Sequence, residues 1–316
     1  MFPADFCYVR AGSLAQALEL LAEGAAAGED VKLLAGGQSL LPMMKLRLAA
    51  PQTLVDIGGI AELAGVTADG AGTTIGALTT YRALQYDQRV ALAFPALADA
   101  LAVLADQQVR ARGTIGGCVA HGDPAADLPA VLLALDARLE IASPRGTRNL
   151  TLDAFLQGVF TTDLAADEVV TAIILPAAPP GAVGSAYEKF EQPASHLPLA
   201  GVCAVVVIDG EVITSARVAV TGVAGRAFRT LDTERSLASA RPADTVIAAA
   251  ASQVATGVRP LSDQHASGPF RLHLAEVLAR RALTRAIQRA VAGEPRPTLG
   301  TPCGHGPDDS KKGPAS

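Results

Sequence analysis

Metal-ligating residues are scarce in this chain. It contains no tryptophan, five histidines and four cysteines among 316 residues. Cys7, Cys118, Cys203 and Cys303 lie far apart, and none belongs to a Cys-x-x-Cys pair, the spacing typical of zinc sites and iron–sulfur clusters. We therefore expect any metal chemistry connected with this chain to take place elsewhere.

Long apolar runs and an excess of basic residues are also missing. The alanine-rich stretches are broken by charges, so no segment is long enough to span a bilayer. The first ten residues lack the basic start and apolar run of a secretory signal. The formal net charge is -5, whereas nucleic-acid-binding proteins usually carry a basic face. These features predict a cytoplasmic protein with no membrane insertion and no nucleic-acid partner.

The usual nucleotide-binding fingerprints are absent as well. No Gly-x-Gly-x-x-Gly follows a strand, and no Gly-Lys-Ser or Gly-Lys-Thr closes a glycine loop, which disfavours a Rossmann or P-loop fold. Glycine pairs occur instead in VKLLAGGQSLLPMMKLRL (31–48) and GTIGG (113–117). A strand that ends in glycines and leads into a helical turn leaves backbone N–H groups free to hold phosphate.

Taken alone, either glycine loop is better explained as an ordinary strand-to-helix turn. Together the two loops could converge on one diphosphate. Ser39, Thr114 and main-chain amides would then be the donors, and a nearby aspartate would be available for a ribose hydroxyl pair.

The rest of the chain predicts a mixture of helices and strands, since hydrophobic residues make up 50% and charged residues 18% of the sequence. Capping residues and apolar periodicity predict a helix from Ser13 that closes at Gly24, and a helix from about Pro124 with Asp123 as its N-cap. Further elements follow from apolar runs and turn residues: strands over 31–36 and 53–58, a helix over 94–105, a hairpin around Pro144–Thr147, and a hairpin at Asp209-Gly210.

Three motifs follow one another along the chain: KLLAGGQSLLPMMKLRLAAP, VRARGTIGGCVAHGDPAADLP and YEKFEQPASHLPLAGVCAVV. In order and spacing they resemble the FAD-binding medium subunit of molybdenum hydroxylases of the carbon monoxide dehydrogenase and xanthine dehydrogenase type. The resemblance covers about residues 1–290.

The resemblance implies an α+β fold in two domains and a tail. Residues 1–176 would form a PCMH-type FAD-binding domain, with subdomains of about 1–58 and 59–176. Residues 180–292 would form a carbon monoxide dehydrogenase flavoprotein C-terminal-like domain, in which a three-stranded antiparallel sheet packs with helices. The Pro/Gly/Ser-rich residues 293–316 are expected to be a disordered tail.

Site residues follow from the resemblance position by position. The first loop would wrap the FAD diphosphate and ribityl chain, the second would contact the diphosphate side, Asp127 would hold the adenosine ribose, and Lys189 would lie near the flavin ring. Apolar positions before the second loop and in the strand DEVVTAIILP complete the set. The implied FAD-binding residues are Lys32, Leu33, Leu34, Ala35, Gly36, Gly37, Gln38, Ser39, Leu104, Thr114, Ile115, Gly116, Gly117, Cys118, Asp127, Val170 and Lys189.

Two positions depart from the pattern of the family. Cys118 stands where the family usually has asparagine, and a thiol is a weak donor and acceptor. His196 and Leu197 occupy the neighbourhood where the family carries an aromatic residue near the flavin. Main-chain contacts survive the first change, so we expect FAD binding to persist.

The function implied is electron transfer within a larger enzyme. Noncovalent FAD would accept electrons from iron–sulfur clusters and pass them to an external acceptor such as NAD or a quinone, with no catalytic side chain required here. The molybdenum cofactor and the 2Fe–2S clusters are expected in a large and a small partner subunit, in a dimer of heterotrimers. The loop Gln192–Pro198 is the candidate contact surface.

Two other functions are compatible with an FAD-domain sequence. A self-sufficient FAD-dependent oxidase or reductase of the same superfamily would need an acid or base over the flavin, and no convincing set follows Gly184. A non-catalytic scaffold is disfavoured by the intact glycine loops. For Lys189, a plain surface lysine is the competing interpretation.

Overall fold

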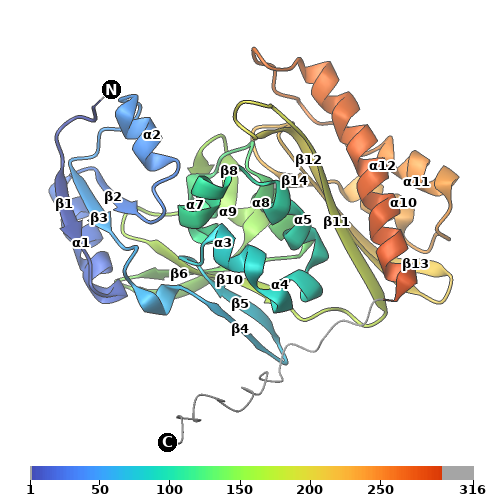
Figure 1. Cartoon of the computed structure of the whole chain (residues 1–316), viewed down its shortest axis with the longest axis horizontal. Helices are drawn as coiled ribbons and strands as arrows, with labels where there is room; N and C mark the ends of the chain where they lie inside the picture. Colours follow the sequence, from blue (N-terminus) through green and yellow to red (C-terminus); the bar gives the residue numbers. More distant parts are fainter. Residues whose placement is uncertain (1, 294–316) are drawn as a thin grey trace, which may run out of the picture.

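The three main sheets of the protein follow one another along its long axis (Figure 1). The computed structural model describes residues 2–293. The predicted tail lies, from residue 294 onward, outside the described residues. No helix of the described part is long and apolar enough to cross a membrane.

The N-terminal unit is a parallel sheet of three strands in the order β1-β3-β2. Its elements are β1 (Cys7–Arg10), α1 (Leu14–Ala27), β2 (Val31–Leu34), α2 (Leu40–Lys45), β3 (Thr53–Asp56) and the 3-10 helix η1 (Ala61–Leu63). Ser13 caps α1 as predicted, but the helix continues past Gly24 and ends at Gly28. Gly24 lies inside the helix because only a residue without a side chain fits against Val31 of the neighbouring strand.

The second unit is built on an antiparallel sheet in the order β4-β5-β10-β6-β7. Its strands are β4 (Val66–Asp69), β5 (Gly72–Gly76), β6 (Arg138–Ser143), β7 (Gly146–Thr151) and β10 (Val169–Pro176), with a small hairpin of β8 (Leu156–Gly158) and β9 (Thr161–Thr162) beside it. The predicted hairpin around Pro144–Thr147 is confirmed as β6 and β7.

Short helices lie between this sheet and the C-terminal sheet (Figure 1). They are α3 (Tyr81–Tyr86), α4 (Gln88–Ala93), α5 (Pro95–Val103), α6 (Gln107–Arg112), α7 (Ile115–His121), α8 (Asp127–Ala134) and α9 (Leu152–Phe155). Two predictions are wrong here. GTIGG is mostly the first turn of α7, capped by Thr114, and α8 begins at Asp127 after Ala126, not at Pro124. Asp123 instead accepts a hydrogen bond from the Ala125 N–H in the turn before α8.

The C-terminal unit is an antiparallel sheet in the order β11-β12-β13-β14. Its elements are β11 (Ala182–Glu191), β12 (Pro198–Asp209), β13 (Val212–Thr221), β14 (Phe228–Arg229), α10 (Leu231–Leu237), α11 (Asp244–Ala251) and α12 (Gly268–Ala292). The three long strands match the prediction, and the two-residue β14 adds a short fourth. The hairpin at Asp209-Gly210 is confirmed. Helices α5 and α8 pack on one side of the sheet and α12 on the other.

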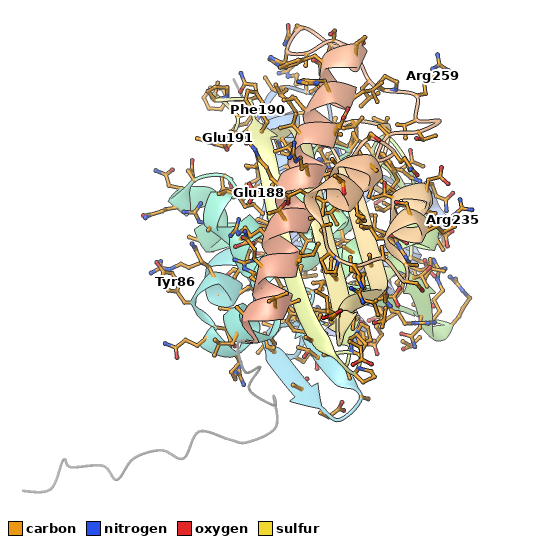
Figure 2. All side chains as sticks on the ribbon, turned by 90° about the vertical axis from the view of Figure 1, so that its right-hand side faces the viewer. Tyr86, Glu188, Phe190, Glu191, Arg235 and Arg259 are labelled. Atoms are coloured by element: carbon orange, nitrogen blue, oxygen red, sulfur yellow. The ribbon has the colours of Figure 1, made fainter. Side chains whose placement is uncertain are left out.

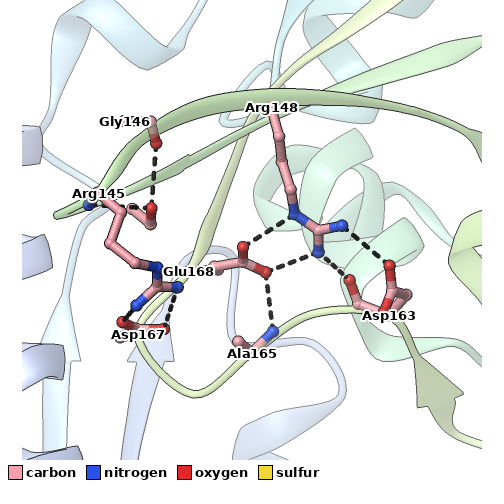
Figure 3. Close-up of polar contacts among 8 residues, drawn as sticks. Arg145, Gly146, Arg148, Asp163, Ala165, Asp167 and Glu168 are labelled. Atoms are coloured by element: carbon pink, nitrogen blue, oxygen red, sulfur yellow. Dashed lines mark hydrogen bonds and ion pairs between the residues drawn. The ribbon is translucent and has the colours of Figure 1, made fainter.

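A network of ion pairs fixes the loop that leads into β10 (Figure 3). The Arg148 guanidinium donates to Glu168 at 2.9 and 2.8 Å and to Asp163 Oδ2 at 2.9 Å. Arg145 pairs with Asp167 beside it. Glu168 also accepts from the Ala165 N–H at 2.9 Å. The hairpin β6–β7 thus anchors the segment that carries the start of β10.

Candidate cofactor site

The first glycine loop presents unpaired backbone donors. After β2 ends at Leu34, the chain turns through Gly37, whose φ of 73° is readily adopted only by glycine. Within residues 2–293, the backbone N–H groups of Gly36, Gly37, Gln38 and Ser39 have no hydrogen-bond acceptor. The Ser39 side chain is exposed and makes no capping bond to α2. Such a run of free N–H groups is suited to an anion.

The second glycine segment lies directly against the first. A Cβ at Gly36 would stand 2.2 Å from the carbonyl oxygen of Arg112 and 2.9 Å from the Cα of Gly113. Any side chain at Gly36 would therefore push the first loop away from the junction of α6 and α7. The structure brings together the two segments that the sequence suggested could converge.

Most of the main-chain donors expected from the second segment are already used, although the Thr114 N–H has no acceptor within residues 2–293. The N–H of Ile115 donates to Thr79 O at 3.1 Å, and the N–H of Gly116 donates to Ala77 O at 2.9 Å. The N–H of Gly117 donates to the Thr114 hydroxyl oxygen at 3.2 Å. The first two bonds tie α7 to the end of β5, so most free amides of the site come from the first loop and the second segment adds only that of Thr114.

Cys118 belongs to α7 and is partly buried against the main hydrophobic core. Burial raises the pKa of its thiol to about 12. Burial likewise raises the pKa of Tyr81 well above its ordinary value. Both groups are protonated near neutral pH, so the cysteine acts as a packing residue with a weak polar contact.

Asp127 and Lys189 form a buried ion pair. Lys189 Nζ lies 3.2 Å from Asp127 Oδ1, and the side chain of each residue is only 4% exposed. The Tyr187 hydroxyl donates to the same Oδ1 at 2.8 Å, and Lys189 also donates to His196 O at 2.8 Å. Burial raises the pKa of Asp127 to about 6, although the Lys189 ammonium opposes this rise. The interpretation of Lys189 as a plain surface lysine is wrong.

The family resemblance implied separate roles for Asp127 and Lys189, whose side chains are direct neighbours in the structure. The adenosine ribose and the flavin ring lie at opposite ends of an extended FAD, whereas the two side chains meet at 3.2 Å. The roles of Asp127 and Lys189 toward FAD therefore stay predictions. Asp127 is linked to the glycine segments through Cys118 and Tyr81, whose pKa values it raises electrostatically.

Leu104 and Val170 lie inside the main hydrophobic core, which also includes Tyr81 and Tyr187. Leu104 and Val170 are each 6% exposed. The Leu104 carbonyl accepts from Arg110 Nη1 at 2.7 Å, and Val170 pairs with Ile141 beside a bulge in β10.

Sequence reasoning missed Tyr187, although it quoted the YEKF motif. Successive residues of a strand point to opposite faces, so positions two apart share a face. Tyr187 and Lys189 of β11 are two apart and both bond to Asp127. The alternation of the strand was the signal that could have identified the tyrosine.

His121 follows the second segment and packs against an aromatic ring. Its ring packs against Phe160 at a centroid distance of 5.0 Å, and burial lowers its pKa. Among the residues that the structure describes, no group of three His, Cys, Asp or Glu could hold a metal ion.

Family models match both halves of the chain. The FAD-binding domain of molybdopterin dehydrogenases matches residues 4–178, and the carbon monoxide dehydrogenase flavoprotein C-terminal domain matches residues 185–286. The chain belongs to the FAD-binding medium subunits of the molybdenum hydroxylases.

Relatives resemble this medium subunit over nearly its whole length. The carbon monoxide dehydrogenase medium chain of Hydrogenophaga pseudoflava is 38% identical over 290 residues, covering 92% of this chain and 99% of that one. Subunit alpha of the 6-hydroxypseudooxynicotine dehydrogenase complex of Paenarthrobacter nicotinovorans is 36% identical over 291 residues, covering 92% and 97%. The solved carbon monoxide dehydrogenase structure from Hydrogenophaga pseudoflava superposes with a TM-score of 0.87, covering 92% of this chain and 99% of that chain.

The residues of this medium subunit fit the FAD that its family binds. The free N–H groups from Gly36 to Ser39 match the needs of a diphosphate, which carries negative charge and accepts several hydrogen bonds. Gly117 of the second segment is exposed, and its lack of a side chain permits a close approach. Asp127, as an ionised carboxylate, can accept from cofactor hydroxyl groups.

Proposed function

We propose that this medium subunit is an electron-transfer flavoprotein, which takes electrons from iron–sulfur clusters of a partner and passes them to an external acceptor such as NAD or a quinone. The observation that carries the proposal is the loop Gly36–Ser39, with its row of free N–H groups against the α6–α7 junction. The redox chemistry comes from FAD when it is bound, while the chain binds and orients it.

We assign noncovalent FAD to the residues that the sequence suggested, with altered roles for some of them. Lys32–Ser39 supply the main-chain cradle, Thr114–Cys118 form the wall behind it, and Asp127 and Lys189 act as one pair at a single part of the cofactor. Leu104 and Val170 support the site from the core. The domain limits 1–176 and 180–292 stay proposals, and the cytoplasmic location stays a prediction.

We further propose a small iron–sulfur subunit and a large molybdenum-cofactor subunit as partners, in a dimer of heterotrimers. Their docking surface would include the loop Gln192–Pro198. The apolar side chains Phe190, Leu197 and Phe270 support this choice, because they are 47%, 40% and 43% exposed at this end of the C-terminal sheet. Phe190 and Phe270 contact each other edge to face at 6.3 Å.

The test is to purify the chain alone and together with the products of neighbouring genes. Alone it should carry FAD, accept electrons from dithionite, and fail to oxidise heterocycles, aldehydes or carbon monoxide. With its neighbours it should co-purify with an iron–sulfur protein. Turnover by the isolated chain would instead support a self-sufficient flavoenzyme, and the absence of any iron–sulfur partner would refute the electron-transfer proposal.

A matched pair of variants tests the docking surface. Phe190→Glu should reduce co-purification with the iron–sulfur protein while FAD content stays unchanged. Tyr86→Glu is the control, because Tyr86 is 72% exposed on α3 and lies well away from Phe190 (Figure 2). Equal recovery of the partner with both variants would exclude Phe190 from the interface.

A further inference from the structure

Tyr187 of β11 reaches from the C-terminal domain into the candidate cofactor site. The residue is 3% exposed, and its hydroxyl donates to Asp127 Oδ1 at 2.8 Å. Lys189 approaches the same oxygen. The other oxygen, Oδ2, accepts no hydrogen bond from residues 2–293. One oxygen of Asp127 is thus held by the protein, while the other is free for a ligand.

The backbone of Tyr187 is fixed as firmly as its hydroxyl. Its N–H donates to Asp99 Oδ2 of α5 at 3.2 Å. Arg289 of α12 donates to that carboxylate at 2.7 and 3.0 Å, and Arg285 bonds to it too. Arg285 also bonds to Glu188, which lies beside α12 on β11 (Figure 2). The tyrosine is therefore clamped where α5, β11 and α12 meet.

The neighbouring strand, β12, leaves space for the Tyr187 hydroxyl because it has a glycine, Gly201, at that position. A Cβ on Gly201 of β12 would lie 2.3 Å from the Tyr187 hydroxyl oxygen and 3.0 Å from its Cζ. The next strand fixes the start of α8, because the Thr221 hydroxyl bonds to Ala126 O at 2.6 Å and to Pro124 O at 3.0 Å. Both the helix that carries Asp127 and the carboxylate itself are held by the C-terminal sheet.

We propose that Tyr187 is a positioning residue that aims the Asp127 carboxylate at bound FAD. The inference rests on the proposed role of Asp127 toward FAD. The hydroxyl occupies Oδ1 and fixes the side-chain rotamer, which leaves Oδ2 turned toward the cofactor. A hydrogen bond to an ionised group is strong enough to matter for affinity.

The first test measures FAD binding to the full-length, FAD-stripped chain by flavin fluorescence. Tyr187→Phe keeps the ring but removes the hydroxyl, and should raise the Kd for FAD about tenfold. Tyr86→Phe, on the exposed face of α3, is the matched control and should leave the Kd unchanged. Thermal unfolding of the stripped proteins shows whether the fold is retained.

The pH profile distinguishes positioning from a merely structural effect. FAD binding should tighten as pH rises through the pKa of Asp127, about 6 in this structure, because the ionised carboxylate is the better acceptor. The groups that face it are Lys189, Tyr187 and Glu191 from β11, with Cys118 and Tyr81 from α7 and α3. Tyr187→Phe should move the pH midpoint of FAD binding upward, because the hydrogen bond from the tyrosine hydroxyl favours the ionised form of Asp127. Asp127→Asn should remove the step.

Gly201→Ala provides an independent perturbation, since it displaces the hydroxyl without deleting it. It should weaken FAD binding in the wild-type background and have a smaller effect in the Tyr187→Phe background, where the clashing atom is absent. If Asp127→Ala weakens FAD binding but Tyr187→Phe changes neither the Kd for FAD nor the pH midpoint, the positioning role of Tyr187 is overturned, while the role of Asp127 in FAD binding is retained. An unchanged Kd in Asp127→Ala overturns both.

Discussion

Gly36→Ala is the sharpest single test of the cofactor loop. The added methyl would stand 2.2 Å from Arg112 O and 2.8 Å from the Arg112 carbonyl carbon. Both are backbone atoms of the α6–α7 junction, so no side-chain rotation can relieve the overlap. The loop itself has to move, and with it the free N–H groups from Gly36 to Ser39.

The size of the effect follows from the overlap. Restoring an ordinary carbon–oxygen separation of about 3.3 Å requires a shift of about 1 Å. Such a shift takes hydrogen bonds of about 2.9 Å beyond their useful range. If two bonds to the diphosphate are lost, at about 1.5 kcal/mol each, FAD affinity falls by about 3 kcal/mol, or roughly a hundredfold. Overpacking alone would reduce the free energy of unfolding by about 1–3 kcal/mol.

The assay is FAD titration of the stripped protein, together with its thermal unfolding. Gly70→Ala is the control, because a Cβ at Gly70 in the β4–β5 turn would meet nothing within 4 Å. It should match the wild type in both measurements. A Gly36→Ala protein that binds FAD with the wild-type Kd would show that the loop does not hold the diphosphate, and the site assignment would have to be abandoned.

Three further predictions concern single side chains. In titrations, Asp127→Ala and Lys189→Ala should each weaken FAD binding relative to FMN binding by the same factor, because their side chains meet at 3.2 Å. If one variant mainly weakened FAD binding and the other mainly FMN binding, a shared location would be contradicted. At pH about 8 a thiol reagent should label the exposed Cys7 much faster than the partly exposed Cys118, since burial raises the pKa of Cys118 to about 12; peptide mapping of the stripped protein checks this. Hydrogen bonds from Arg148 lower the pKa of Glu168 below 4.5, so the pair stabilises the folded protein above that pH and this contribution is lost on acidification. Glu168→Gln should lower the free energy of unfolding by about 1 kcal/mol at neutral pH and make urea unfolding less dependent on acid pH. An unchanged pH dependence of unfolding would refute the linkage.

Local rules predicted the hairpins well because their signals are short-range. Asp209-Gly210 needs only its neighbours to form the turn between β12 and β13, and Gly210 adopts a φ of 58° there. The same rules failed at Gly24 and Gly116. A glycine inside a helix looks like an end signal, but these two lie where the helix packs tightly against Val31 and Ala77. Tertiary packing, which no local pattern encodes, decided both cases.

The sequence could indicate which segments form the candidate cofactor site, but not which groups of each segment are free to contact the cofactor. Both glycine segments looked like phosphate loops, yet the amides of Ile115 and Gly116 are used in holding α7 to the end of β5. Asp127 and Lys189 were expected at different ends of the cofactor, and a contact between residues so far apart in sequence joins them. Such pairings depend on the approach of the C-terminal sheet to α8, which only the folded chain shows.

That approach also explains why the two domains work as one unit. Every residue of α8 is buried, because the helix lies between the FAD-binding domain and strands β12 and β13. Both protein partners of the Asp127 carboxylate come from β11. Without the C-terminal domain, Asp127 would face water without its lysine or its tyrosine, and an apolar helix would be exposed. The glycine loop can hold a diphosphate by itself, but the buried charge at Asp127 depends on the second domain.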